Sequence, residues 1–331
     1  MNRIFSALVL AWALSVVDAH AGTVTFGQGA NQFAMEFVTI GNPGNAADTN
    51  MDATPRNAGR VTYTYDIGKF EISREMITKY NAATENAYRQ ITLADMTSYG
   101  GNGPNKPATG VSWNEAARFV NWLNTSTGNA AAYKFTTAGV NDNISLWQSG
   151  DAGYDASNPF RNRFAKFVLP SHDEWYKAAY YNADGSNYYI SPNGSNTAPE
   201  AVSSGLTGAV YYREFSQGPA NVTQAGGLSP YGVMGLGGNV WEMQESTADL
   251  SNTDATTTRM WRGGTWNSDF HELSVWRVGP YNLFPTNDSI NIGFRVATVT
   301  PADATVPEPS TMVIGTILGL GGLLGKRRMK R

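Results

Sequence analysis

Glycine and aromatic residues, more than any long periodic segment, set the kind of fold that this chain can adopt. Of its 331 residues 35 are glycine, 12% are aromatic and only 15% are charged. Glycine permits the positive φ values of tight turns, and buried Trp and Tyr side chains supply large areas of apolar contact. A disordered chain would be poor in aromatic residues. We therefore expect a loop-rich globular protein with tight turns and Trp/Tyr packing.

The N-terminus has the pattern of a secretory signal peptide. Arg3 precedes an apolar stretch over residues 4–17, and Ala19 and Ala21 form an Ala-x-Ala cleavage site. This arrangement is typical of a segment that signal peptidase removes. We expect residues 1–21 to be the signal peptide and the mature chain to begin near Gly22.

The C-terminus has three parts, Pro307-Glu308-Pro309, an apolar run over residues 312–325 and a basic end. A stable membrane-spanning helix needs about 20 apolar residues, so this run is short, and the basic end favours the cytoplasmic side. The three-part pattern resembles the PEP-CTERM sorting signal of exopolysaccharide-producing Gram-negative bacteria. The resemblance implies transient anchoring in the inner membrane, cleavage by an exosortase, and release or attachment at the cell surface. The alternative is an ordinary C-terminal anchor, which the short run disfavours.

Charge and residue types narrow the function of the segment between these signals. The whole chain has a net charge of −3, and removal of the five basic residues of the tail leaves about −8. An acidic protein is a poor partner for nucleic acid, because basic patches supply most of that affinity. The chain has no cysteine, so it has neither a disulfide nor a thiolate ligand. Only His172 and His271 remain after export, which argues against a histidine-rich metal site.

Two serine capping boxes predict the clearest helices. Ser112 with Glu115 starts a helix that runs to Leu123, and Ser171 with Glu174 starts one that runs to Tyr180. In the second box we expect the neighbouring His172 to lie at the surface. Further expected elements are a helix over 74–84, strands over 34–40, 60–72, 259–264 and 291–296, and loops over 41–59 and 99–110.

Several short signatures follow one another in a fixed order. They are Val111-Ser-Trp-Asn-Glu-Ala, Leu169-Pro170 with Glu174-Trp175, Gly238-Asn-Val-Trp-Glu242, Arg262-Gly263-Gly264-Thr-Trp266 and Gly293-Phe294-Arg295-Val. Together they resemble the formylglycine-generating-enzyme (sulfatase-modifying factor) domain over about residues 35–298. The resemblance implies an α+β, C-type-lectin-like fold with few helices, small sheets and many loops. It assigns residues 22–300 to this domain and 301–331 to a linker and the sorting tail.

The motif residues have a structural interpretation. Gly263 and Gly264 allow close backbone approach, and the guanidinium groups of Arg262 and Arg295 can hold carbonyls or carboxylates together. We expect the motif tryptophans to lie in the core. They are Trp113, Trp175, Trp241 and Trp266.

Relative to the family, the positions for its two catalytic cysteines hold Ser268 and Leu273. In family members these cysteines bind copper, and soft Cu(I) requires thiolate ligands. We therefore expect no copper and no formylglycine-generating oxidase activity.

A calcium site is the second feature that the resemblance implies. The backbone carbonyls of Gly238 and Val240 and the side chain of Glu242 match the family ligands, but the upstream Asp or Asn is Gly235 here. Since Ca²⁺ takes six to eight oxygen ligands, this loss weakens the site. In the alternative interpretation, Glu242 accepts from a loop N–H group or pairs with an arginine.

Two functional hypotheses remain. The first is an exported cell-surface or extracellular-matrix protein whose lectin-like domain binds exopolysaccharide or surface proteins without catalysis. The second is a divergent enzyme of the family with different chemistry. A filled apolar site at Ser268 and Leu273 would favour the first, whereas a deep polar pocket with perturbed pKa values would favour the second.

Overall fold

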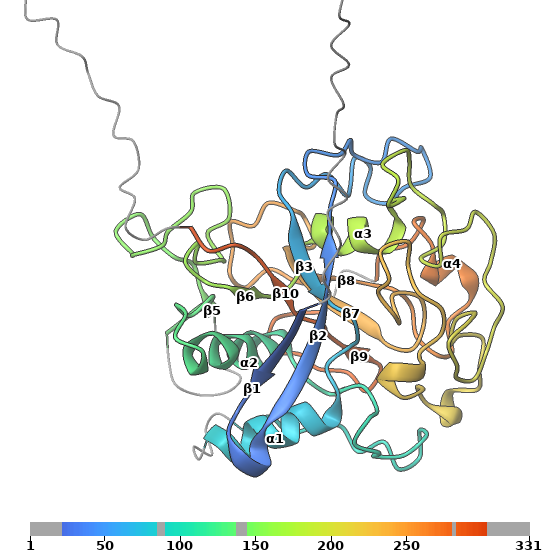
Figure 1. Cartoon of the computed structure of the whole chain (residues 1–331), viewed down its shortest axis with the longest axis horizontal. Coiled ribbons are helices and arrows are strands. Elements are labelled where there is room, and N and C mark those ends of the chain that lie inside the picture. Colours follow the sequence, from blue (N-terminus) through green and yellow to red (C-terminus); the bar gives the residue numbers. More distant parts are fainter. Residues whose placement is uncertain (1–21, 85–89, 137–143, 280–282, 303–331) are drawn as a thin grey trace, which may run out of the picture.

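A curled, antiparallel five-stranded sheet joins the two ends of the domain (Figure 1). The computed structural model describes residues 22–84, 90–136, 144–279 and 283–302. The strand order is β1-β2-β3-β10-β6, in which β10 near the C-terminus pairs with both β3 and β6. The strands are β1 (Gly22–Phe26), β2 (Phe33–Ile40), β3 (Tyr65–Gly68), β10 (Ala297–Thr298) and β6 (Phe167–Val168). The five-stranded sheet is therefore complete only when β10, the last strand in the sequence, pairs with β3 and β6.

Short helices lie around this sheet. They are α1 (Arg74–Thr84), α2 (Trp113–Ser126), α3 (His172–Tyr180) and α4 (Phe270–Leu273). The first three start where the sequence predicts, whereas the fourth was not predicted. Both serine capping boxes are formed, in α2 between Ser112 and Glu115 and in α3 between Ser171 and Glu174. Single-turn 3₁₀ helices occur at Gly29–Asn31, Phe215–Gln217 and Val222–Gln224.

A second, three-stranded sheet carries two of the sequence motifs. Its order is β8-β7-β9, with β7 antiparallel to β8 and parallel to β9. The strands are β7 (Trp241–Thr247), β8 (Arg259–Arg262) and β9 (Ile292–Gly293). Every residue of β7 is buried, which places its polar side chains in the interior. A separate two-stranded ribbon consists of β4 (Lys134–Phe135) and β5 (Ile144–Ser145).

Aromatic side chains fill the core, as the composition predicts. Trp113, Trp175 and Trp266 are completely buried, and Trp241 is nearly so. Phe119 of α2 contacts aromatic rings from several elements, with ring centroids 5.4–6.3 Å away. Its partners are Phe33, Tyr80, Trp122 and Phe294. One continuous aromatic cluster thus connects α1, α2 and the C-terminal Gly-Phe-Arg motif.

Three expectations from the sequence were wrong in detail. The strand expected over 60–72 is limited to β3. Tyr63 lies before this strand, and its hydroxyl donates a hydrogen bond to Glu174 Oε1 at 2.6 Å. The strand expected over 291–296 is limited to β9. His172 is 2% exposed rather than at the surface, because the N-terminus of α3 packs against β7.

The predicted signal peptide and sorting tail, with Ala19, Ala21, Pro307, Glu308 and Pro309, lie outside the described residues. Within the described ranges, no helix has the length and apolar character needed to cross a membrane.

Candidate functional site

The two positions that hold copper ligands in the family lie close together in the interior. A Cβ atom added to Gly264 would lie 2.7 Å from Leu273 Cδ1 and 3.3 Å from Ser268 Oγ, so both side chains flank this glycine. The Ser268 hydroxyl accepts a hydrogen bond from Thr265 N at 2.9 Å. Leu273 is fully buried and packs in a small apolar cluster with Ala209. The fold therefore keeps the paired geometry, while the side chains provide a hydroxyl and an isobutyl group.

Little empty space remains beside this pair. The neighbouring cavity, lined by Ala209 and Gly237 among others, has a volume of about 10 Å³. That volume accommodates no more than about one water molecule. The neighbourhood of Ser268 and Leu273 is therefore a filled, partly apolar interior.

The Arg262-Gly263-Gly264 motif organises the backbone around these residues. Arg262 is fully buried, donates through Nη2 to the carbonyl of Thr54, and places its guanidinium 4.8 Å from the ring centroid of Tyr176. Gly263 and Gly264 have φ values of +103° and +75°, which side chains with a Cβ rarely adopt. The motif thus has packing and conformational roles in this chain.

Arg295 of the Gly-Phe-Arg motif forms a buried ion pair with Glu242. Both side chains are 0% exposed. Arg295 Nε donates to Glu242 Oε2 at 2.5 Å and Nη2 donates to Oε1. Trp175 Nε1 adds a third hydrogen bond, to Oε2, at 2.6 Å. The arginine pairing that was one of the alternatives for Glu242 is therefore present.

Glu71 is a site residue that the sequence did not reveal. It follows β3 and is 1% exposed. Its Oε2 accepts from Asn239 Nδ2 at 2.7 Å, whereas Oε1 has no hydrogen-bond partner. Burial, and then the nearby charge of Glu242, hold the pKa of Glu71 well above its usual range. No motif marks Glu71 in the sequence, and its partner lies 168 residues away.

The carboxyl group of Glu71 lies beside Gly235. A Cβ atom at Gly235 would lie 3.4 Å from Glu71 Cδ and 3.5 Å from Oε1. Two buried carboxylates therefore lie near the expected carbonyl ligands of Gly238 and Val240. They are Glu242, which Arg295 and Trp175 already engage, and Glu71 from the segment after β3. This all-oxygen donor set suits a hard cation such as Ca²⁺ and not copper. In the described residues, no group of three or more His, Cys, Asp or Glu side chains could hold a metal ion, so backbone carbonyls would have to complete any site.

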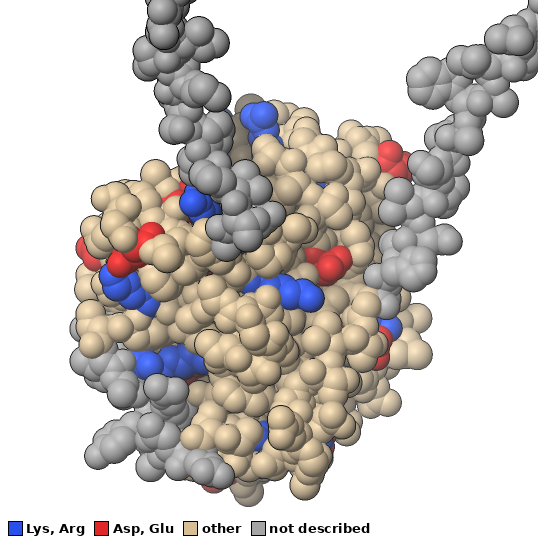
Figure 2. All heavy atoms as spheres, turned by 60° about the vertical axis from the view of Figure 1, so that its left-hand side comes forward, with Lys and Arg blue, Asp and Glu red and all other residues tan. Residues whose placement is uncertain are grey.

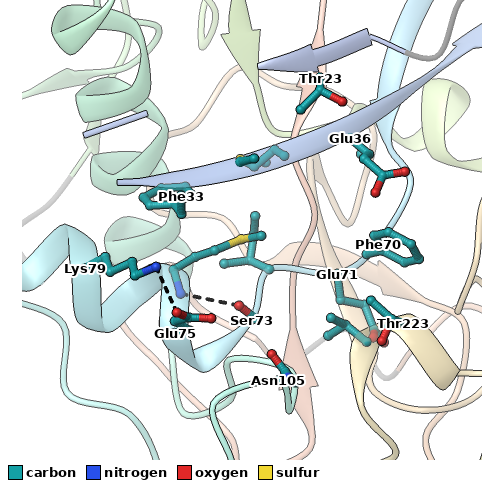
Figure 3. Close-up of a pocket in the computed structure, with 16 residues that line it drawn as sticks. Thr23, Phe33, Glu36, Phe70, Glu71, Ser73, Glu75, Lys79, Asn105 and Thr223 are labelled. Carbon is teal, nitrogen blue, oxygen red and sulfur yellow. Dashed lines mark hydrogen bonds and ion pairs between the residues drawn. The ribbon is translucent and has the colours of Figure 1, made fainter. Parts of the chain in front are cut away.

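A surface cleft lies on the other side of Glu71, between β2 and α1 (Figure 3). It has a volume of about 310 Å³. Lys79 pairs with Glu75 at 2.8 Å, and Lys69 near the rim pairs with Glu36 at 2.9 Å. The walls between these pairs include Phe33, Met35, Ile72 and Met76. Among the described residues that line the cleft there is no histidine, and Glu36 and Glu75 are each paired with a lysine.

Comparison with known proteins identifies the family. The family model described as "Sulfatase-modifying factor enzyme 1-like domain" matches residues 17–300. No curated protein sequence matches the chain.

Solved structures with a similar fold include Treponema denticola variable protein 1, with a TM-score of 0.56, 20% identity, and 83% of this chain and 98% of that chain covered. The structure of CarF matches with a TM-score of 0.54 and 19% identity, and the match covers 81% of this chain and 99% of CarF. PvdO from Pseudomonas aeruginosa matches with a TM-score of 0.53 and 16% identity, and the match covers 86% of this chain and 100% of PvdO. These likenesses show the fold alone, and they confirm the predicted α+β, C-type-lectin-like architecture.

Proposed function

Because the chain belongs to the sulfatase-modifying factor enzyme 1-like domain family, we propose that it is a non-catalytic member, exported and displayed at the surface of a Gram-negative cell. The observation that carries this proposal is the filled interior at Ser268 and Leu273, where family members need two thiolates. Leu273 is fully buried against apolar neighbours, and the adjoining cavity holds about 10 Å³. A hydroxyl and an isobutyl group stand at these positions, and neither is a ligand for Cu(I).

The direct test is oxidation of a peptide with a sulfatase cysteine motif, in the presence of Cu(I) and oxygen. We expect the mature protein neither to bind Cu(I) nor to form formylglycine. The matched variant Ser268→Cys/Leu273→Cys restores two thiols at positions that flank Gly264. We expect this variant to bind Cu(I), which would validate the binding assay. Peptide oxidation by the unaltered protein would refute the proposal and favour an enzyme.

The proposed export route rests on the sequence signals. Signal peptidase would cut after Ala21, and an exosortase would act near Pro307-Glu308-Pro309 after transient membrane anchoring. Expression in a host with and without an exosortase, followed by fractionation and mass spectrometry of both termini, tests this route. Persistence of the intact tail in the inner membrane of both hosts would instead indicate an ordinary anchor.

The surface suits exopolysaccharide or surface proteins as partners better than nucleic acid. On the face shown in Figure 2, Lys and Arg side chains are scattered, with Asp and Glu among them, over a largely uncharged surface. Nucleic-acid binding depends on clustered basic side chains that contact phosphates. This distribution agrees with the acidic net charge of the mature chain.

We further propose that the Gly235–Glu242 loop binds Ca²⁺, with Glu71 in place of the ligand missing at Gly235. The support is the unpartnered Glu71 Oε1 beside Gly235. A cation bound only to the native state raises its stability, so thermal unfolding with Ca²⁺ and with chelator is the measurement. An upward shift that Glu71→Gln abolishes supports the site, and an unchanged melting temperature rejects it.

A further inference from the structure

A polar groove lies between two loops that follow β2 and α3. Its volume, about 650 Å³, is twice that of the cleft beside Glu71. The loops approach each other near the top of Figure 1. Residues 45–50 of the first loop line one side of the groove, and Tyr181 with residues 185–188 of the second loop line the other. Pockets of several hundred Å³ bind small molecules, so the groove has room for a short oligomer.

Hydrogen bonds between the loops hold the groove in shape. Asn45 Nδ2 donates to Gly59 O and to the Tyr188 hydroxyl, each at 2.7 Å. Asn42 Nδ2 crosses to the second loop and donates to Ala183 O at 2.9 Å. A site whose walls are fixed in this way loses little conformational entropy when a ligand binds.

The groove presents donors that the protein itself does not use. In the described part of the chain, the Thr49 hydroxyl and the amide nitrogens of Asn50 and Asn187 make no hydrogen bond, and all three residues are exposed. Asp48 also lines the groove and is largely buried. Its Oδ2 already accepts from Tyr176 at 2.7 Å and its Oδ1 from Asn50 N at 2.9 Å, so the carboxylate is held in place.

Two tyrosine rings add an apolar surface to this polar setting. The Tyr181 and Tyr188 centroids lie 4.7 Å apart with the planes inclined by 56°. The Tyr188 ring is partly exposed in the groove, while its hydroxyl faces the Ala46 carbonyl at 2.9 Å. Its hydroxyl is used within the protein, so the partly exposed Tyr188 side chain adds apolar ring surface to the groove.

We propose that this groove binds a neutral oligosaccharide segment. Asparagine amides and a fixed carboxylate match the paired donors and acceptors of vicinal hydroxyl groups, and an aromatic face matches the C–H face of a sugar ring. Among the residues that the structure describes, no Lys or Arg lines the groove, so an anionic sugar would meet no counter-charge there, and the polar lining disfavours an apolar ligand. The inference deepens the proposed surface-binding function and rests on it.

The test is titration of the mature protein, by calorimetry and ligand-observed NMR, with oligosaccharides at up to about 10 mM. The neutral probes are tetramers of β-1,4-glucose, α-1,4-glucose and N-acetylglucosamine, and the charged comparisons are tetragalacturonate and tetraglucosamine. We expect at least one neutral probe to bind and the anionic probe not to bind. Absence of binding by all neutral probes, or stronger binding of a charged one, overturns the proposal.

Substitutions then locate the binding. We expect Asn50→Ala and Asn187→Ala each to weaken binding about tenfold, the loss of one well-formed hydrogen bond. Both side chains are exposed, so we expect the fold to survive. Asn105→Ala, an exposed asparagine of the Figure 3 cleft, is the matched control and should bind normally. Equal affinity in all three variants would exclude this groove. The outcome is independent of the copper assay, so failure of one proposal is distinguishable from failure of the other.

Discussion

Replacement of Arg295 with methionine tests how far the fold depends on one buried charge. Arg295 holds the carboxylate of Glu242 through Nε and Nη2, and both side chains are 0% exposed. Its other contacts fix two loops, since Nη1 donates to Gly68 O at 2.8 Å and Nη2 to Met234 O at 2.9 Å. Methionine preserves much of the apolar stem and removes every one of these donors.

The expected loss is large. Removal of one partner from a buried ion pair costs about 3–5 kcal/mol, because the other charge stays buried without compensation. Two carbonyls also lose a donor, at about 1 kcal/mol each. A total of about 5–7 kcal/mol is comparable with the whole stability of many domains. With about 2–4 °C for each kcal/mol in a domain of this size, the melting temperature should fall by about 10–28 °C.

Urea unfolding in chelator at pH 5 and pH 8 is the assay. The Arg295→Met loss should be larger at pH 8, because at pH 5 a proton can neutralise one of the carboxyl groups that Arg295 now compensates. The double variant Glu242→Gln/Arg295→Met should recover part of the loss, since the buried charge is removed together with its partner. A loss below about 1 kcal/mol, or one that is identical at the two pH values, would refute the reasoning.

Three further predictions concern buried positions. Gly238→Ala should destabilise the protein far more than Gly232→Ala, as measured by thermal unfolding. Both glycines have positive φ, but a Cβ atom at Gly238 would lie 2.1 Å from Val210 O, whereas one at Gly232 would meet no atom within 4 Å. His172 has a pKa lowered to about 3 by burial, so the folded state binds fewer protons and stability should fall as the pH drops from about 6.5 toward 3, by up to about 1.4 kcal/mol per pH unit. His172→Gln should flatten that slope in urea unfolding. In chelator, the raised pKa of Glu71 should cost stability as the pH rises above about 4.5, so Glu71→Gln should stabilise the protein more at pH 8 than at pH 5; a pH-independent effect would contradict this.

Local chemistry made the helices predictable. A serine followed three residues later by glutamate satisfies the free N–H groups of a first turn, and this signal is complete within four residues. The helix starts at Trp113 and His172 follow from it directly. The short strands carry no such local signal. β9 and β10 have two residues each, and their partners are more than 50 residues away or in another motif, so pairing rather than propensity determines them.

His172 shows the limit of a local argument. Its position after a capping serine indicates an exposed first turn. In the fold, however, that turn meets β7, where His172 N donates to Ser246 Oγ at 3.0 Å and Nδ1 lies 2.9 Å from Gln244 Oε1. The strand β7 is polar in sequence yet fully buried. Only Trp241 and Met243 indicate burial in its sequence, and the other five residues are polar.

The altered family sites show two kinds of substitution. At Leu273, where the family resemblance implies a copper ligand, there is instead an apolar side chain that packs with Ala209. At Gly235 the side chain that the family resemblance implies is absent, and the carboxyl of Glu71 lies beside the position, with Cδ 3.4 Å from where a Cβ atom would be. The first change is visible in the sequence, because leucine has no donor atom. The second is not, because Glu71 and Gly235 meet only after the sheet of β1–β3 and the loop before β7 have packed together. A missing ligand in a sequence motif is therefore evidence for a lost metal site only when no other carboxylate reaches the same space.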